Sequence, residues 1–383
     1  MHKYLFIIFF ATAFQPCYSQ QEDNITGDEE KIINQSFTNT NFHDVGNYVS
    51  PKGKKVKNII LMIGDGMGTT QVQAGFTANK GQLNIQNCPV TGYAKTSASD
   101  NYITDSAAAG TAFACGVKTY NGAIGVDHEG TSVETILESA IRHNMKTGLV
   151  ATCRITHATP ASFIAHQVSR NMYEEIAEDF LKTPIDLFIG GGRENFDNRK
   201  DNKNLLNELS SNGYTVVTST DSLEFVSSGK LAGLIHKGDQ PRVSEGRGEM
   251  LGIATRKALE LLDNENGFFL MIEGSQIDWG GHDNRTDYVV EEMLDFDKAI
   301  GQVLEFAAKD EQTLVIITAD HETGGLAIIN GSTESGTVEG AFSTRGHTSV
   351  MVPVYAFGPS SELFQGVYEN NQIYHKMITA IGF

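Results

Sequence analysis

The stretch "NIILMI" at residues 58–63 runs directly into Gly64 and Asp65. Its apolar residues follow one another without polar alternation, which is typical of a strand that is covered on both faces. Six further runs share this character: "TGLVAT" (147–152), "IDLFIG" (185–190), "YTVV" (214–217), "GFFLMI" (267–272), "LVIITA" (314–319) and "MVPVYAFG" (351–358). We therefore predict seven buried strands.

Helical patterns separate these runs. The clearest spans Thr286 to Lys309, where apolar residues recur at helical spacing: Val289, Val290, Met293, Phe296, Ile300, Val303 and Leu304. Strands that alternate with helices are typical of an α/β fold. We predict a central, mostly parallel sheet with helices on both faces.

The composition limits the classes of function. The 383 residues are 40% hydrophobic and carry a formal net charge of −18, with no compensating basic run. Binding to nucleic acid as a specific partner depends on positive charge against phosphates, so the composition argues against it. An acidic protein that handles an anion needs local positive charge, which bound metal ions can supply.

The first residues, "MHKYLFIIFFATAFQPCYSQ", predict an export signal. His2 and Lys3 precede a short apolar run, and the small residues Cys17 and Ser19 fit a cleavage site before Gln20. We predict a signal peptide at 1–19 and a periplasmic or secreted protein. Lipidation of Cys17 is the less favoured alternative, and no stretch predicts a stable membrane span. A polar, variable lead-in (20–56) and a single domain (57–383) would follow. Cys88, Cys115 and Cys153 are expected to be free thiols.

Three of the apolar runs end at a carboxylate: Asp65, Glu273 and Asp320. In a parallel sheet the carboxyl ends of the strands meet at one edge, where ligands bind. One such acid could be a helix cap, and Asp65 could be only that. Three together favour a metal site, because clustered carboxylates repel one another unless a cation neutralises them.

Histidines accompany these acids. His321 adjoins Asp320, Asp278 and His282 are four residues apart on one side of a predicted helical turn, and His347 precedes the last strand. Zinc accepts mixed histidine and carboxylate ligands, whereas magnesium prefers oxygen alone. Two metals roughly 3.5–4 Å apart would clamp the attacking and leaving oxygens of a phosphoryl transfer.

Ser106 opens a helix of small residues in "YITDSAAAGTAFACGVKT" (102–119). Its hydroxyl would lie where backbone N–H groups and the positive end of the helix dipole point outward, an environment suited to a phosphate. For an isolated Asp-Ser pair, a simple cap by Asp105 or Ser106 is the usual explanation. The predicted metal cluster favours a nucleophile instead, since a metal can activate a serine hydroxyl without a histidine base.

Six motifs, in order, resemble those of the alkaline phosphatases: "IGDGMG", "TDSAAAGTA…GVKTYNGAIGVD", "THATPASFIAHQVSR", "EGSQIDWGGH", "TADHETGG" and "GHTSVMVPVYAFGP". The likeness spans about residues 58–359 and is greatest to the short, cold-active-like bacterial members. It implies the alkaline-phosphatase-like sandwich fold. It also implies hydrolysis of phosphate monoesters through a phosphoserine on a site with two zinc ions and one magnesium ion.

The resemblance assigns roles to individual residues. It implies Ser106 as nucleophile and Arg170 as the phosphate-binding guanidinium, a task that suits its planar fork. The implied ligands are Asp278, His282 and His347 for the first zinc, Asp65, Asp320 and His321 for the second, and Asp65, Thr159 and Glu273 for magnesium. The resemblance places His157 where some members of the family carry aspartate, and Trp279 where some carry lysine. Trp279 would therefore remove a cation close to the phosphate and could pack over the phosphate instead. His157 would lie beside the magnesium site and could loosen its preference for magnesium or admit zinc, whereas His166 is interpreted as structural.

Small phosphomonoesters are the expected substrates and inorganic phosphate the product. The resemblance also implies that the chain could form a homodimer, as members of the family commonly do. Two alternatives remain open. One is a phosphodiesterase or sulfatase of the same superfamily, although Ser106 and Arg170 favour monoesters. The other is a protein that binds phosphate or metal without turnover. The segment 195–246 could cap the site or serve association.

Overall fold

A computed structural model describes residues 35–383, so the predicted signal peptide lies outside the described residues. The strands are β1 (Gln35–Thr38), β2 (Asn58–Gly64), β3 (Val90–Lys95), β4 (Lys146–Arg154), β5 (Leu187–Gly191), β6 (Tyr214–Val217), β7 (Lys230–Leu234), β8 (Phe268–Gly274), β9 (Thr313–Thr318), β10 (Glu322–Thr323), β11 (Leu326–Ser332), β12 (Thr337–Phe342), β13 (His347–Thr348), β14 (Val352–Phe357) and β15 (Gly366–Glu369). The α-helices are α1 (Thr69–Ala78), α2 (Ser106–Cys115), α3 (Ile136–Arg142), α4 (Ala158–Ala161), α5 (Tyr173–Lys182), α6 (Glu194–Asp197), α7 (Leu205–Ser211), α8 (Thr220–Leu223), α9 (Met250–Leu262), α10 (Ile277–His282), α11 (Thr286–Asp310) and α12 (Gln372–Ile381).

Ten of the strands between residues 35 and 383 form one sheet, in the order β15-β3-β14-β9-β2-β8-β4-β5-β7-β6. The seven strands from β9 to β6 are all parallel to their neighbours. Strand β14 runs antiparallel to both β3 and β9, and β15 pairs parallel with β3. This topology confirms the predicted mostly parallel sheet, and each of the seven predicted strands is present. The predicted burial is wrong for β6, which lies at one edge of the sheet and exposes Thr215.

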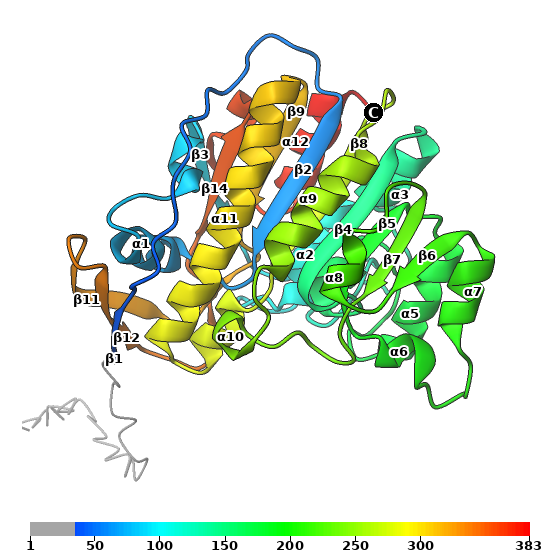
Figure 1. The fold of residues 1–383 in the computed structure, drawn as a ribbon, viewed down its shortest axis with the longest axis horizontal. Coiled ribbons are helices and arrows are strands. Elements are labelled where there is room, and N and C mark those ends of the chain that lie inside the picture. Colours follow the sequence, from blue (N-terminus) through cyan, green and yellow to red (C-terminus); the bar gives the residue numbers. More distant parts are fainter. Residues whose placement is uncertain (1–34) are drawn as a thin grey trace, which may run out of the picture. The chain divides into compact units, whose positions relative to one another are not determined.

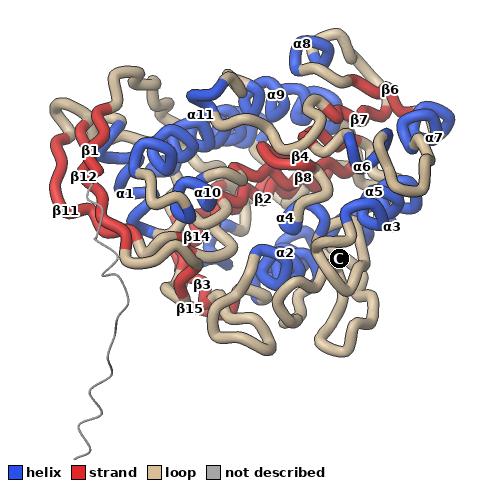
Figure 2. Tube along the Cα trace, turned by 90° about the horizontal axis from the view of Figure 1, so that it is seen from below, coloured by secondary structure: helices blue, strands red, loops and turns tan. Residues whose placement is uncertain are grey.

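Helices cover both faces of this sheet. Helices α9 and α11 pack on strands β8, β4, β2 and β9 from one side, and α3, α4 and α12 pack from the other. Figure 1 shows α9 and α11 in front of the strands, and Figure 2 shows α2, α3 and α4 on the opposite side from α9 and α11. Helix α11 has nearly the bounds that its apolar periodicity predicts.

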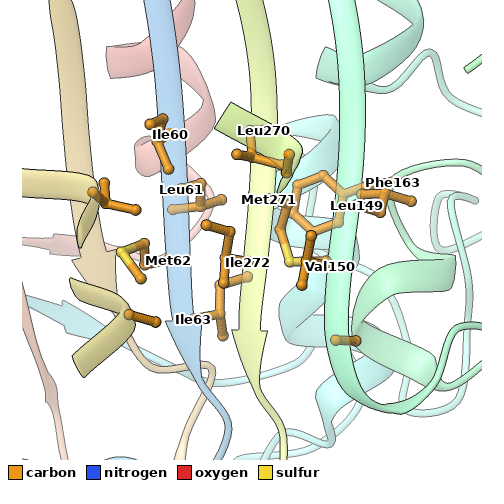
Figure 3. Close-up of a cluster of buried hydrophobic side chains, with 14 of the residues drawn as sticks. Ile60, Leu61, Met62, Ile63, Leu149, Val150, Phe163, Leu270, Met271 and Ile272 are labelled. Atoms are coloured by element: carbon orange, nitrogen blue, oxygen red, sulfur yellow. The ribbon is translucent and has the colours of Figure 1, made fainter. Parts of the chain in front are cut away.

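The core lies at the centre of the sheet. Every residue of β2 and β8 is buried, and the apolar side chains of β2, β8 and β4 pack side by side (Figure 3). Burial of one such Leu, Ile or Met side chain contributes about 1.5–3 kcal/mol. The unbroken apolar runs therefore form the most deeply buried strands. They give rigid support to the residues that follow the carboxyl ends of these strands.

Two smaller sheets and one segment complete the arrangement. Strand β1 belongs to the predicted lead-in and pairs antiparallel with β12, which also pairs with β11. The two-residue strands β10 and β13 pair with each other. Segment 195–246 contains β6, β7 and α7, so much of it extends the large sheet at one edge.

Among the described residues, no helix combines the length and apolar content that crossing a membrane requires.

Candidate metal centre and phosphate site

Four neighbouring strands carry most of the predicted ligands. In the order β9-β2-β8-β4, Asp320 follows β9, Asp65 follows β2, Glu273 lies at the end of β8, and Thr159 lies on α4 after β4. Because these strands are parallel, their carboxyl ends meet at one edge of the sheet. Helix α10, which follows β8, lies beyond this edge (Figure 1).

The first cluster consists of Asp278, His282 and His347. Helix α10 places Asp278 and His282 one turn apart, with His282 Nε2 3.3 Å from Asp278 Oδ1. His347 Nε2 lies 3.2 Å from His282 Nε2 and 3.6 Å from Asp278 Oδ1. The three side chains thus direct one nitrogen or oxygen each toward a common point.

The second cluster consists of Asp65, Asp320 and His321. His321 Nε2 lies 3.1 Å from Asp320 Oδ2 and 3.5 Å from Asp65 Oδ1, and all three residues are fully buried. The rings of His321 and His347 stack with 3.5 Å between their centroids, and His321 lies within 4.8 Å of ligand atoms of both Asp278 and His347. The two clusters are therefore adjacent, with His321 between them.

A glycine permits this close approach. Gly66 follows Asp65 with a φ of +73°, in the left-handed region that favours glycine. A Cβ atom there would lie 2.7 Å from the Asp278 Cα and 2.8 Å from the Thr323 hydroxyl. Any larger residue at position 66 would push the two clusters apart.

Several buried oxygens at the carboxyl ends of these strands have no hydrogen-bond partner among residues 35–383, and oxygens of the predicted magnesium ligands are among them. They are both carboxylate oxygens of Asp65, Oε1 of Glu273, Oδ2 of Asp320 and the hydroxyl of Thr159. Buried polar atoms are nearly always hydrogen-bonded, so such a group calls for an ion or water. The donor set fits metals: two mixed clusters of imidazole and carboxylate suit zinc, and the all-oxygen group suits magnesium.

The electrostatics of the clusters agree with this chemistry. Burial, reinforced by the nearby carboxylates of Asp320, Asp278 and Glu273, raises the pKa of Asp65 well above its usual range. Burial raises the pKa of Glu273 to about 7. Burial acts in the same direction on Asp278, but its three histidine neighbours outweigh it and lower its pKa. Without cations, the edge cannot keep all of its carboxylates ionised, so it is an environment that attracts divalent ions.

Ser106 lies at the same edge. It is the first residue of α2, is 2% exposed, and its Oγ lies 3.3 Å from His321 Nε2. Asp105 is the cap of this helix, because its Oδ1 accepts a hydrogen bond from the Ala108 N–H. Cap and candidate nucleophile are thus separate residues, and the Ser106 hydroxyl is available beside the second cluster.

Arg170 comes from another segment and contacts Asp105, the residue that precedes Ser106. Its Nη1 donates to Asp105 Oδ2 at 3.0 Å, and its Nη2 lies 3.3 Å from His157 Nε2, which must act as the acceptor because a guanidinium can only donate. The His157 ring meets the Trp279 ring edge to face, with 6.3 Å between centroids. His157 therefore lies beside Arg170, and within residues 35–383 the guanidinium makes no other side-chain hydrogen bond, so its remaining N–H groups can bind an anion.

Sequence reasoning missed three residues of the site. Asp105 was weighed only as a cap, yet it also holds Arg170. Thr323 donates to Asp278 Oδ1, and its hydroxyl lies 3.2 Å from His321 Nδ1. Glu322 is a buried acid next to these ligands. For Glu322 and Thr323, the only signal in the sequence is their position directly after "ADH" (319–321). By contrast, Cys88, Cys115 and Cys153 are free and buried, as expected.

Comparisons with known proteins identify the family of the chain. The alkaline phosphatase family model matches residues 56–341 and 333–383. The chain is 38% identical to alkaline phosphatase 4 of Bacillus subtilis over 82% of this chain and 87% of that protein. It is 30% identical to the alkaline phosphatase of Escherichia coli over 94% and 90% of the two chains.

Solved structures give the same result. The alkaline phosphatase from the Antarctic bacterium TAB5 is 43% identical, with a TM-score of 0.81 over 88% of this chain and 99% of that one. A cold-active alkaline phosphatase from a psychrophilic Shewanella is 32% identical, with a TM-score of 0.78 over 85% and 99%. The chain therefore belongs to the alkaline phosphatase family and is an enzyme that hydrolyses phosphate monoesters.

Proposed function

We propose that Ser106 is the nucleophile of this hydrolysis and that Arg170 binds the phosphate group of the substrate. One observation carries the proposal: the Ser106 hydroxyl stands at the N-terminus of a buried helix, 3.3 Å from the histidine that lies between the two ligand clusters. An attacking oxygen and a positive helix end then lie together, and the cap of the same helix, Asp105, holds the Arg170 guanidinium. An in-line phosphoryl transfer requires these three elements.

We propose that Asp278, His282 and His347 hold one zinc ion, and that Asp65, Asp320 and His321 hold a second. Asp65, Thr159 and Glu273 would hold magnesium. The unpartnered buried oxygens and the donor types support this assignment. When bound, these ions would lower the pKa of the serine hydroxyl and of water and would neutralise developing negative charge.

The residues of the chain then act in two displacements. Arg170 grips two phosphate oxygens while the N–H groups of α2 face the same group, so the phosphorus is held in front of Ser106. The Ser106 oxygen forms a bond to phosphorus as the bond to the leaving oxygen breaks, and the alcohol departs with a proton. Water then forms a bond to phosphorus, the bond to Ser106 breaks, and phosphate and the free serine result.

His157 bears on the identity of the third metal. The family resemblance places His157 where some members carry aspartate, and a variant of the Antarctic enzyme with a histidine replaced by aspartate has magnesium bound in its M3 site. An imidazole is a poorer partner for magnesium than a carboxylate. We propose that His157 weakens the preference for magnesium here, and that Trp279, which meets its ring, shields the phosphate in place of a cation.

Metal analysis together with turnover tests these assignments. Purified protein should contain about two zinc ions per chain, lose p-nitrophenyl phosphate hydrolysis on chelation and regain it with zinc. Ser106→Ala should retain the metal and lose nearly all turnover, whereas Ser211→Ala, on the exposed end of α7, should match the wild type. Retained activity in Ser106→Ala would reject Ser106 as the nucleophile. Faster hydrolysis of bis(p-nitrophenyl) phosphate, a diester, than of p-nitrophenyl phosphate would reject the preference for monoesters.

We also propose that the protein is exported and that residues 1–19 are removed. The basic start, the short apolar run and the small residues before Gln20 support this proposal. N-terminal sequencing of protein recovered outside the cytoplasm should begin at Gln20. A chain that retains its first residues, or that carries lipid on Cys17, would contradict cleavage at this point.

A further inference from the structure

Glu322 is a buried carboxylate to which the proposed reaction gives no role. It is 4% exposed, and both of its oxygens are saturated by hydrogen bonds. Oε1 accepts from Gln71 Nε2 at 2.7 Å and from the Leu326 N–H at 3.1 Å, and Oε2 accepts from the Gly325 N–H at 3.2 Å and from the Thr348 hydroxyl. With four donors on two oxygens, Glu322 has little capacity left to ligate a metal.

These donors come from the segments that carry the proposed metal ligands. Gln71 lies in the first turn of α1, directly after the turn that contains Asp65. Thr348 follows His347 on β13, and Glu322 itself follows His321 at the start of β10. One carboxylate therefore connects the segments that present Asp65, His321 and His347.

Thr323 extends this connection to helix α10, which carries Asp278. Its hydroxyl donates to Asp278 and contacts His321, while its backbone carbonyl accepts from the same Gln71 amide at 2.9 Å. Strand pairing places Thr323 opposite His347. Any movement of β10 relative to β13 or α1 would thus displace ligands of both clusters together.

The local packing is built to admit Glu322. Gly68 caps α1 beside it, and a Cβ atom at that position would lie 2.4 Å from the Glu322 Cγ. The absence of a side chain at Gly68 lets the carboxylate reach Gln71 and the turn at Gly325. Among residues 35–383, no basic side chain forms an ion pair with Glu322. Hydrogen bonds hold both of its carboxylate oxygens and thereby fix backbone and side-chain positions.

We propose that Glu322 is a positioning residue: it locks β10, β13 and α1 together so that Asp65, His321 and His347 are already arranged for metal binding. This inference rests on the proposed metal site. Partners that orient metal ligands typically change metal affinity by about 10- to 100-fold when they are removed.

The test measures zinc affinity rather than turnover alone. Full-length Glu322→Gln and Thr348→Val are titrated with zinc against a chelator of known affinity, and the unfolding temperature of each metal-free chain is recorded. We expect each variant to bind zinc at least about 10-fold more weakly than wild type. Thr348→Ser keeps the hydroxyl and should bind as wild type does. Glu339→Gln, on β12 of the separate sheet, is the matched control for loss of a glutamate.

The outcomes separate this role from a purely structural one. Zinc affinities within about twofold of wild type, with only a lower unfolding temperature of the metal-free chain, would overturn the proposal. So would a Thr348→Ser variant as weak as Thr348→Val, since the hydroxyl would then be irrelevant. A wild-type chain that takes up no zinc would refute the proposed metal site and this inference with it, whereas zinc uptake by wild type and variants alike would refute the positioning role only.

Discussion

Asp105 performs two tasks with one carboxylate, and the two can be separated by mutation. Oδ1 caps α2 through the Ala108 N–H at 2.9 Å, and Oδ2 holds Arg170 Nη1 at 3.0 Å. Serine is a good helix cap but cannot reach Arg170, whereas alanine can do neither. We predict that Asp105→Ser and Asp105→Ala weaken phosphate binding equally, and that only Asp105→Ala also destabilises the fold.

The magnitudes follow from the two contacts. Replacing a serine cap by alanine costs about 1 kcal/mol, so Asp105→Ala should unfold about 1 kcal/mol more easily than Asp105→Ser. Without its partner, the long Arg170 side chain must be ordered when phosphate binds, which costs about 0.5–1.5 kcal/mol. Loss of a negative charge beside the phosphate opposes this cost. We therefore expect a net weakening of phosphate affinity of roughly 2- to 5-fold.

The assay is inhibition of p-nitrophenyl phosphate hydrolysis by inorganic phosphate, together with urea unfolding of the metal-loaded protein. Asp127→Ser is the control, because Asp127 organises an exposed turn through the Glu129 and Thr131 N–H groups and has no contact with Arg170. Unchanged or tighter inhibition in Asp105→Ser would refute the positioning of Arg170 by Asp105. Equal stability of the Ser and Ala variants would refute the capping role.

Three further predictions concern stability. His166 Nε2 lies 3.0 Å from Glu138 Oε1, and this hydrogen bond raises the pKa of His166 above its ordinary value of 6.5. The protonated histidine therefore stabilises the fold fully below pH 6.5, and this stabilisation is lost as the pH rises through the raised pKa. Burial acts to raise the pKa of Glu138, but the hydrogen bonds from His166 and from the cap residue Thr135 outweigh burial, so this pKa is lowered. The contribution of the Glu138 carboxylate to stability is therefore kept down to acidic pH. His166→Leu should therefore cost about 1 kcal/mol at pH 6 and much less at pH 9, as measured by urea unfolding. Arg247→Met should cost about 3–5 kcal/mol, because it leaves the buried carboxylates of Glu292 and Asp295 without their cation; thermal unfolding measures this loss. Finally, chelation should lower the unfolding temperature, and zinc should restore it, because ions that bind only the folded chain stabilise it.

Each of these has an outcome that contradicts it. A His166→Leu penalty that does not change with pH would show that the pair contributes packing alone. An Arg247→Met variant as stable as wild type would mean that both carboxylates take up protons without cost. Equal unfolding temperatures with and without chelator would contradict a metal site that forms part of the folded core.

The strands that hold the site were predictable, whereas most of those toward the two edges of the sheet were not. Strand β6 is the exception, because its run "YTVV" is apolar enough to stand out although it lies at one edge. The runs of β2, β8 and β9 are buried on both faces, so their sequence is apolar without interruption. Strand β3, with sequence "VTGYAK", alternates buried and exposed residues, and β15 is a short, largely exposed edge strand. Strand β7, "KLAGL", is buried but contains too few large apolar residues to stand out.

Within the site, predictability depended on the kind of contact. Acids at strand ends and Asp278 with His282 could be identified because a regular element fixes their spacing. Thr159 and Arg170 came from family resemblance alone, since each reaches the edge from a loop or a short helix whose position no periodicity encodes. The hydrogen bonds of Glu322 and Thr323 join segments far apart in sequence, and such contacts appear only once the chain is folded.

The fold and the metal chemistry depend on each other at this edge. Strands β9, β2, β8 and β4 must lie side by side because their apolar runs are buried on both faces, and their carboxyl ends then converge whatever residues stand there. Burial, together with repulsion between the acids at several of these ends, raises the pKa of Asp65 and of Glu273. Protonation would relieve that repulsion but would leave nothing to activate Ser106. Divalent ions relieve it and at the same time supply the positive charge that an acidic chain needs to attract phosphate. The same burial that organises the core thus creates the demand for the metals on which the proposed reaction depends.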